Sequence, residues 1–425
     1  MSARAPLHAF AAYGIEIEYA IVDRDTLDVR AIADKLLADA AGAEVNEFSD
    51  GGPIAWSNEL SLHVIELKTN GPAASLDGLD TLFATDLARI ETLLAKYNAR
   101  ILPGPMHPWM DPLTEQRLWP HEQNEIYAAY DRIFNCKGHG WANLQSMHIN
   151  LPFADDAEFV RLHDAIRIAL PLLPALAAAS PYVDGKASGL LDTRLETYRL
   201  NQRRVPEIAG CVVPDRVASI DEYHTRILQP MFKAITPHDP DAVLRGEWLN
   251  SRGAIARFDR GAIEIRVLDA QESPRADLAV ACVVTALVRE LYEQRASTAA
   301  RQAQVTTATL ASLFERSLRE GEQTVLDDTT VLVALGLGTE PMTMGTAWAA
   351  ICSRNGVTRG AQGEAVAGLL ARAPLARQLL AAGGSAPSRA ELREVYRWLC
   401  AALDANRLYS FKGSEFSRGQ IFKGS

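Results

Sequence analysis

The stretch GIEIEYAIV, residues 14–22, decides the fold class of this chain. Its side chains alternate between apolar and polar, which is the pattern of a half-buried β-strand. The carboxylates of Glu16 and Glu18 therefore point to the same face of that strand. We expect one face to pack against a core and the other to carry two like charges.

Further segments of the first 290 residues extend this pattern. The same alternation recurs in residues 62–68 (LHVIELK), 145–151 (QSMHINL) and 262–268 (AIEIRVL). The apolar spacing of a helix occurs in residues 80–97, 156–179 and 276–294. Strands that are polar on one face and interleaved with helices favour an antiparallel sheet in an α+β layer structure.

The composition changes near residue 290. Downstream, Ala, Leu, Arg and Glu dominate and strand patterns nearly vanish, which predicts a mainly helical C-terminal region. Ser388, followed three residues later by Glu391, predicts a helix start with a capping box. Residues 410–425 repeat FKGS and are predicted to form a flexible end or a lid.

The overall composition is that of a globular protein of 425 residues with a net charge of -10. No basic run is present, so nucleic acid is not an expected partner. The five cysteines are odd in number and form no CxxC pair, which predicts reduced thiols. The most apolar stretch, residues 166–179, is shorter than the roughly 20 residues that span a bilayer. We therefore expect a cytoplasmic protein without a membrane partner.

The polar faces of the predicted strands share acidic and imidazole groups. Besides Glu16 and Glu18, these are Glu66, His148 and Glu264. An isolated ExE motif is usually structural, but four strands with such groups favour a metal site. Carboxylates with one imidazole and no thiolate suit Mg²⁺ or Mn²⁺ better than zinc. Because the chain has no GxxxxGK[ST] motif, nucleotide phosphates would have to be held by metal ions and arginines.

Three other residues are weaker candidates. Arg266 shares the face of Glu264, where it would either clamp a phosphoryl group or form a structural ion pair across the sheet. Arg194 is expected in a loop after a helix exit, where binding groups are common. Glu59 lies seven residues before Glu66 and joins the site only if the chain turns or bulges between them.

These segments, in this order, resemble the glutamate-cysteine ligase superfamily, particularly its carboxylate-amine ligase branch. The resemblance rests on GIEIE at 14–18, NELSLHVIELKT at 58–69, SMHINLP at 146–152, ALAAASPYVDGKASGLLDTR at 175–194 and AIEIRVLD at 262–269. It implies the fold of glutamine synthetase and the guanidino kinases, a curved antiparallel sheet that forms a funnel. It also implies a catalytic domain over residues 8–290, followed by a helical region over residues 291–425.

The resemblance implies an ATP-dependent ligase that joins a carboxylate, with the γ-carboxylate of glutamate favoured, to an amine through an acyl phosphate. The implied ligands of Mg²⁺ or Mn²⁺ are Glu16, Glu18, Glu59, Glu66, His148 and Glu264. The implied nucleotide-phosphate contacts are Glu16, Glu18, His148 and Arg266. The implied catalytic residues are Arg266 and Arg194.

Other functions remain open at this point. A kinase of the same fold would phosphorylate a guanidino or carboxylate group and stop there. A metal-dependent amidohydrolase would use the carboxylates to activate water, and a binding protein would use them without turnover. The partners we expect are a small-molecule carboxylate, an amine and ATP, and association into a homo-oligomer is left open. The sequence does not identify the amine or fix the carboxylate.

Overall fold

The computed structural model describes residues 6–409, and within this range the largest sheet has eight strands, all paired antiparallel. Its order is β2 (Glu47–Phe48), β3 (Ile54–Asn58), β4 (Val64–Thr69), β1 (Gly14–Asp23), β6 (Ser146–Pro152), β10 (Ala262–Asp269) and β9 (Ala254–Arg257). The remaining strand, β5 (Ala99–Leu102), pairs with the C-terminal end of β1. The predicted α+β class with a large antiparallel sheet is confirmed.

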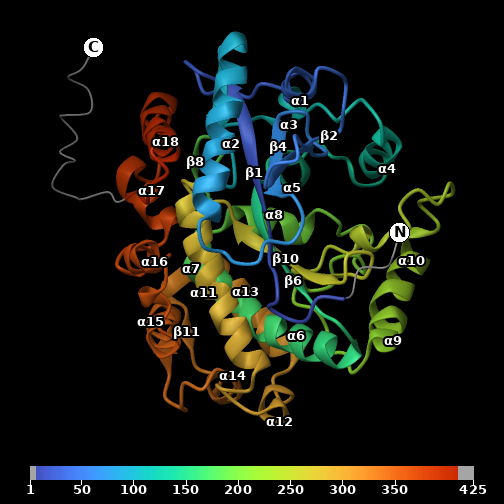
Figure 1. The fold of residues 1–425 in the computed structure, drawn as a ribbon, viewed down its shortest axis with the longest axis vertical. Helices are drawn as coiled ribbons and strands as arrows, with labels where there is room; N and C mark the ends of the chain where they lie inside the picture. Colours follow the sequence, from blue (N-terminus) through green and yellow to red (C-terminus); the bar gives the residue numbers. More distant parts are fainter. Residues whose placement is uncertain (1–5, 410–425) are drawn as a thin grey trace.

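Strand β1 runs through the centre of the sheet (Figure 1). The alternate residues of β1 that belong to the main hydrophobic core are Ile15, Ile17, Tyr19 and Ile21. Glu16 and Glu18 lie on the opposite face, as the alternation predicts. Further along that face, Ala20 and Val22 are covered by side chains of the last two helices. The polar part of this face is therefore confined to the N-terminal half of β1.

Helices pack on both faces of the sheet. Up to residue 292 they are α1 (Ala33–Ala41), α2 (Leu79–Leu94), α3 (Pro112–Glu115), α4 (Asn124–Phe134), α5 (His139–Ala142), α6 (Asp156–Ala169), α7 (Leu173–Ala177), α8 (Thr193–Leu200), α9 (Ile220–Tyr223), α10 (Gln229–Ile235) and α11 (Pro274–Tyr292). The helices predicted near residues 80–97 and 276–294 correspond to α2 and α11. Both pack their apolar stripes into the main core.

The helix predicted over residues 156–179 is not continuous. It divides into α6, a short 3₁₀ segment (Leu170–Leu172) and α7. Proline lacks a backbone N–H and clashes with the preceding turn, so Pro171 and Pro174 each fall at the start of a new segment.

The C-terminal region is mainly helical, as predicted. It contains α12 (Ala299–Gln302), α13 (Thr307–Glu320), α14 (Thr329–Ala334), α15 (Met344–Asn355), α16 (Gly363–Leu370), α17 (Leu375–Gly383) and α18 (Arg389–Asp404), with a two-stranded sheet of β11 (Val325–Leu326) and β12 (Met342–Thr343). Helices α15 to α18 form a column along one side of the molecule (Figure 1). The predicted capping box of Ser388 and Glu391 opens α18.

The main hydrophobic core is shared between the sheet and the C-terminal helices. Trp348 of α15, for example, donates a hydrogen bond from its indole Nε1 to the carbonyl of Leu172 at 2.9 Å. The domain division near residue 290 stays a prediction, and the predicted flexible tail, residues 410–425, lies outside the described residues. Between residues 6 and 409, none of the helices combines the length and apolarity needed to cross a bilayer.

Candidate active site

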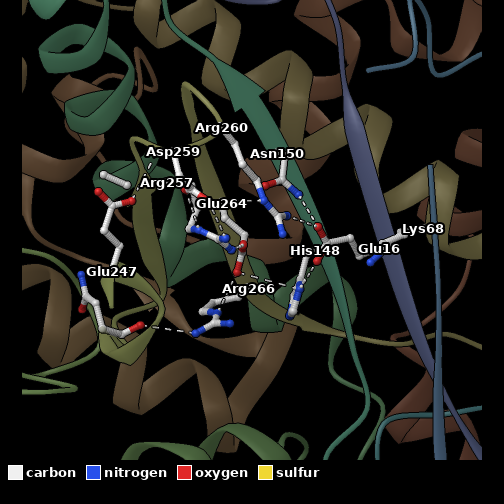
Figure 2. A network of polar contacts seen from close by, with 12 residues as sticks. Glu16, Lys68, His148, Asn150, Glu247, Arg257, Asp259, Arg260, Glu264 and Arg266 are labelled. Carbon is white, nitrogen blue, oxygen red and sulfur yellow. Dashed lines mark hydrogen bonds and ion pairs between the residues drawn. The ribbon is translucent and has the colours of Figure 1, made fainter. Parts of the chain in front are cut away.

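The strand register brings the predicted polar residues onto one patch of the sheet. Glu16 lies directly opposite His148 of β6, and Glu18 lies directly opposite Glu66 of β4. Glu264 of β10 lies within 4.0 Å of His148, measured from Oε1 to Nδ1 (Figure 2). Five residues from four strands thus meet, and we call this set, with Glu59, the carboxylate cluster.

Two overlapping groups in the carboxylate cluster have the spacing of metal ligands. One ligand atom from each of Glu16, Glu66 and His148 lies within 4.8 Å of the others. The same holds for Glu18, Glu59 and Glu66, so Glu66 is common to both groups. Glu59 reaches the cluster because the chain turns between β3 and β4, which is the condition that the sequence left open.

Hydrogen bonds hold the cluster residues in place. His148 uses Nδ1 toward Glu16 Oε2 at 3.0 Å and Nε2 toward the Ser146 hydroxyl at 2.9 Å. Glu18 Oε2 accepts from the backbone N–H of Ser146 at 2.7 Å. Glu66 Oε2 accepts from the Ser57 hydroxyl at 2.7 Å. The ligand atoms are therefore oriented before any cation arrives.

Burial, the neighbouring carboxylates and His148 shift the pKa values of the cluster in opposite directions. Burial and the negative charge of Glu16 raise the pKa of Glu66 to about 8. Burial and the charges of Glu18, Glu66 and Glu16 likewise raise the pKa of Glu59 well above its ordinary value. Burial also opposes ionisation of Glu16, but the hydrogen bond and charge of His148 outweigh it and lower its pKa to about 2. Without a cation, the cluster therefore retains protons at neutral pH.

This donor set fits one or two hard divalent cations. Oxygen ligands dominate, a single imidazole joins them, and no thiolate is present in either group. Glu264 Oε1 is buried and has no hydrogen-bond partner among the described residues. A cation would relieve the repulsion that raises the pKa of Glu59 and Glu66. The roles of these residues as metal ligands stay predictions.

Arg266 lies beside Glu264, as predicted. Its Nε is 3.1 Å from Glu264 Oε1, and its side chain also donates to the Asn250 carbonyl at 3.3 Å (Figure 2). A second arginine, Arg257 of β9, contacts the other oxygen of Glu264 at 3.3 Å. The sequence did not single out Arg257, because its place opposite Ala262, two residues from Glu264, depends on a strand pairing that only the structure reveals.

One cavity of about 220 Å³ opens beside the cluster, and we call it the Arg194 cavity. Its charged lining residues are Glu18, Glu59, His148, Arg194 and Arg266. Its aromatic lining residues are Tyr127, Tyr130, Trp141, Tyr198 and Trp248. Both predicted catalytic arginines therefore face the same space as three members of the cluster.

Arg194 is not in a loop, as the sequence predicted, but in the first turn of α8. Asp192 caps this helix, which draws the segment into the fold and leaves Arg194 only 1% exposed. Its Nε donates to Asp269 at 2.5 Å, while its Nη2 has no partner among residues 6–409. Asp269 also accepts from the N–H of Ala179 at 2.8 Å and from the hydroxyl of Ser180 at 2.9 Å. Asp269 thus anchors Arg194 while one of its nitrogens stays available.

Four residues that line the Arg194 cavity each have a buried polar atom without a hydrogen-bond partner in the described structure. The atoms are the donors Arg194 Nη2 and Trp141 Nε1 and the acceptors Asn201 Oδ1 and Gln202 Oε1. Buried polar atoms are rarely left unpaired in folded proteins. The cavity is therefore complementary to a small ligand that carries both accepting and donating groups. Trp141, Asn201 and Gln202 were not predicted as site residues, because in the sequence they resemble ordinary loop and helix residues.

A second cavity, of about 400 Å³, opens on the other side of the cluster, and we call it the Lys68 cavity. Its polar lining includes Glu16, Lys68, Asn150 and Arg260. Its apolar lining includes Leu7, Ala12, Ala55, Pro72, Pro152 and Ala262. Glu16 lines this cavity whereas Glu18 lines the Arg194 cavity, so the carboxylate cluster lies between the two.

Comparisons with known proteins agree with this architecture. A protein of Archaeoglobus fulgidus, described as uncharacterized, is 40% identical over 282 residues, which cover 66% of this chain and 75% of that protein. The glutamate-cysteine ligase of Francisella tularensis, solved in complex with AMP, shares the fold with a TM-score of 0.56 at 13% identity, covering 96% of this chain and 91% of that one.

The match to a protein-family model identifies the family and the reaction class of this chain. The model of glutamate-cysteine ligase family 2 matches residues 12–381, which include every member of the carboxylate cluster and both arginines. Among the reaction classes that the sequence left open, this match supports the ligase. The chain therefore belongs to glutamate-cysteine ligase family 2 and is an ATP-dependent carboxylate-amine ligase.

Proposed function

We propose that this enzyme activates the side-chain carboxylate of an amino acid, with glutamate as the favoured donor, and joins it to an amine. The observation that carries the proposal is the set of four unpaired polar atoms in the Arg194 cavity, which adjoins the carboxylate cluster. An amino acid has a carboxylate for Arg194 Nη2 and Trp141 Nε1. It also has an ammonium group for the oxygens of Asn201 and Gln202.

The residues of the carboxylate cluster would hold the metal ions. Glu16, Glu66 and His148 would bind one cation, and Glu18, Glu59 and Glu66 a second, with Mg²⁺ or Mn²⁺ suited to these oxygen ligands. When bound, such cations neutralise phosphate oxygens and favour phosphoryl transfer. Glu264 would complete the site through Oε1, which accepts no hydrogen bond within residues 6–409 and whose charge is balanced by Arg266 at 3.1 Å.

The Lys68 cavity is suited to ATP. Lys68 and Arg260 supply positive charge next to Glu16, and the apolar lining offers a surface for a flat base. The nucleotide would then approach the cluster from one side and the amino acid from the other. This arrangement would place the γ-phosphate near the carboxylate that it is to activate.

The reaction would proceed in two displacements. A carboxylate oxygen of the donor forms a bond to the γ-phosphorus, the bond between that phosphorus and ADP breaks, and Arg266 stabilises the developing charge. The amine nitrogen then bonds to the acyl carbon, and phosphate leaves with the former carboxylate oxygen while the nitrogen loses one proton. The aromatic lining, including Tyr127 and Trp248, would limit access of water to the acyl phosphate.

An ADP-release screen tests this proposal. Amino acids would be supplied as donors, singly and in pairs with amines, in the presence of ATP and Mg²⁺. We expect sustained ADP release only when a donor with a side-chain carboxylate and an amine are both present, and an amide product by mass spectrometry. ADP release that is complete with a single acceptor and leaves a stable phosphorylated product would instead identify a kinase.

The unpaired cysteines favour a cytoplasmic location for this enzyme.

A further inference from the structure

A third cavity lies away from the carboxylate cluster, against helix α11. It has a volume of about 480 Å³, and we call it the Arg289 cavity. Its walls are α11, residues 74–77, the C-terminal end of α15 and residues 356–362. Neither the cluster residues nor Arg194 and Arg266 line it. It shares Tyr13 with the Lys68 cavity, so the two cavities meet at this side chain.

The α11 wall presents polar atoms without partners. Thr285 is 7% exposed, and its hydroxyl has no hydrogen-bond partner in residues 6–409. Arg289 lies one helical turn further on the same face, and its buried Nε likewise has none. Since buried polar atoms are normally paired, these groups are complementary to a ligand that accepts hydrogen bonds.

Arg289 also differs in charge balance from the other arginines of the wall. Arg354 pairs with Glu290 at 2.5 Å, and Arg295 pairs with Glu293 at 2.7 Å. The contacts of Arg289 are instead the Tyr13 hydroxyl at 3.0 Å, the Phe10 carbonyl at 3.4 Å and the Phe10 ring, with no acidic partner in the described part of the chain. Its positive charge is therefore available to an anionic group.

The opposite charge is present at the mouth of the cavity. Asp77 is exposed there, and its carboxylate has no hydrogen-bond or ion-pair partner in the described residues. A simple anion would be repelled by Asp77, whereas a ligand with both charges would satisfy both ends. We propose that the Arg289 cavity binds a small zwitterion of the amino-acid class, with its carboxylate at Thr285 and Arg289 and its ammonium group at Asp77.

Tyr13 links this cavity to the nucleotide side of the enzyme. Arg289 donates to its hydroxyl, and the backbone of Tyr13 pairs with Ala73 next to the wall of residues 74–77. Tyr13 directly precedes Gly14, where β1 begins its course toward Glu16. A carboxylate that binds Arg289 side-on, through Nε and Nη2, competes with the Tyr13 hydroxyl for the hydrogen bond from Nη2. The ligand therefore changes the affinity for ATP, a consequence that rests on the proposed role of the Lys68 cavity, and ATP changes the affinity for the ligand by the same factor.

Binding measurements without turnover test the site. The common amino acids would be titrated singly into the full-length Arg194→Met protein, in which the proposed donor site is weakened, by calorimetry and thermal shift. We expect at least one to bind. Thr285→Val and Asp77→Asn, made in the same background, should each weaken that binding about tenfold, the effect of one lost hydrogen bond to a charged group. Thr92→Val, which changes an exposed helix threonine, is the matched control and should have no effect.

The following results would overturn the Arg289 cavity as a binding site or its coupling to ATP. No amino-acid binding to the Arg194→Met protein, or binding that Thr285→Val and Asp77→Asn leave unchanged, would overturn it. Equal competition by inorganic sulfate would overturn the assignment to a zwitterion. The same amino acid should alter the Kd of a non-hydrolysable ATP analogue severalfold in the wild-type protein, and an unchanged Kd would overturn the coupling through Tyr13. Because no readout uses ADP release, failure of the ligase proposal would not mimic these results.

Discussion

Replacing Arg194 by methionine separates the structural contribution of this residue from its contact with substrate. The variant leaves the carboxylate of Asp269, which is 0% exposed, without its 2.5 Å partner. Breaking a buried ion pair in this way costs about 3 to 5 kcal/mol of unfolding free energy. We expect the lower end, because Asp269 still accepts hydrogen bonds from Ala179 and Ser180.

Adding Asp269→Asn should restore most of that stability. The amide oxygen of asparagine can still accept from Ala179 and Ser180, and it carries no charge that needs a partner. Catalysis should not recover, because the donor carboxylate still lacks Arg194. The lost charged hydrogen bond is worth about 1.5 to 3 kcal/mol, which corresponds to a loss of about 10- to 150-fold in kcat/KM for the donor.

Urea unfolding and ADP-release kinetics on the two variants, with Asp269→Asn alone to complete the cycle, provide the measurements. We expect the free energy of unfolding to fall in Arg194→Met and to recover in the double variant with Asp269→Asn. The kcat/KM for the donor should stay low in both of these proteins. Recovery of kcat/KM together with stability in the double variant would refute the reasoning and make Arg194 purely structural.

Three further predictions concern the carboxylate cluster. The pKa of Glu66 is raised from 4.5 to about 8, so in metal-free protein its contribution to the free energy of unfolding is lost as the pH rises between those values, by at most about 1.4 kcal/mol per pH unit. Over the same range the affinity for Mg²⁺ should rise up to tenfold per pH unit, because the cation binds the ionised carboxylate. Glu66→Gln should flatten the pH dependence of both the melting temperature and the Mg²⁺ affinity measured by calorimetry, and a slope that persists would assign the proton to another residue. His148→Ala should weaken Mn²⁺ binding about 10- to 100-fold in protein that keeps its fold by circular dichroism, and an unaltered Kd by electron paramagnetic resonance would remove His148 from the site. Arg266→Lys keeps the charge but loses the planar fork, so kcat should fall about a hundredfold while the KM for ATP changes little; a lowered melting temperature with kcat preserved would reduce Arg266 to the ion partner of Glu264.

The strand-borne part of the site could be predicted from the sequence because a strand has a strict period of two. That period places Glu16 with Glu18, and the same rule applied to other strands singles out Glu66, His148 and Glu264. Which of them lie opposite one another depends on register, which is set by long-range pairing. The turn that brings in Glu59 is likewise a property of the β3–β4 pair rather than of a local pattern.

The rest of the site lies on elements with weak local signals. Trp141 belongs to α5, a helix of four residues, and such a short segment has too few turns to show an apolar period. Asn201 and Gln202 follow α8, a helix that was not predicted from the sequence. Strands β5 and β9 have four residues each and were also missed. Their placement comes from tertiary contacts, which override local preference.

The central claim is that a carboxylate is activated as an acyl phosphate before the amine attacks. The most direct test supplies the donor amino acid with both oxygens of its side-chain carboxylate replaced by ¹⁸O, together with ATP, Mg²⁺ and the amine, and analyses the released phosphate by mass spectrometry. Because the former carboxylate oxygen leaves with the phosphate, we predict one ¹⁸O atom in each phosphate for each amide formed. Unlabelled phosphate alongside amide formation would contradict the account.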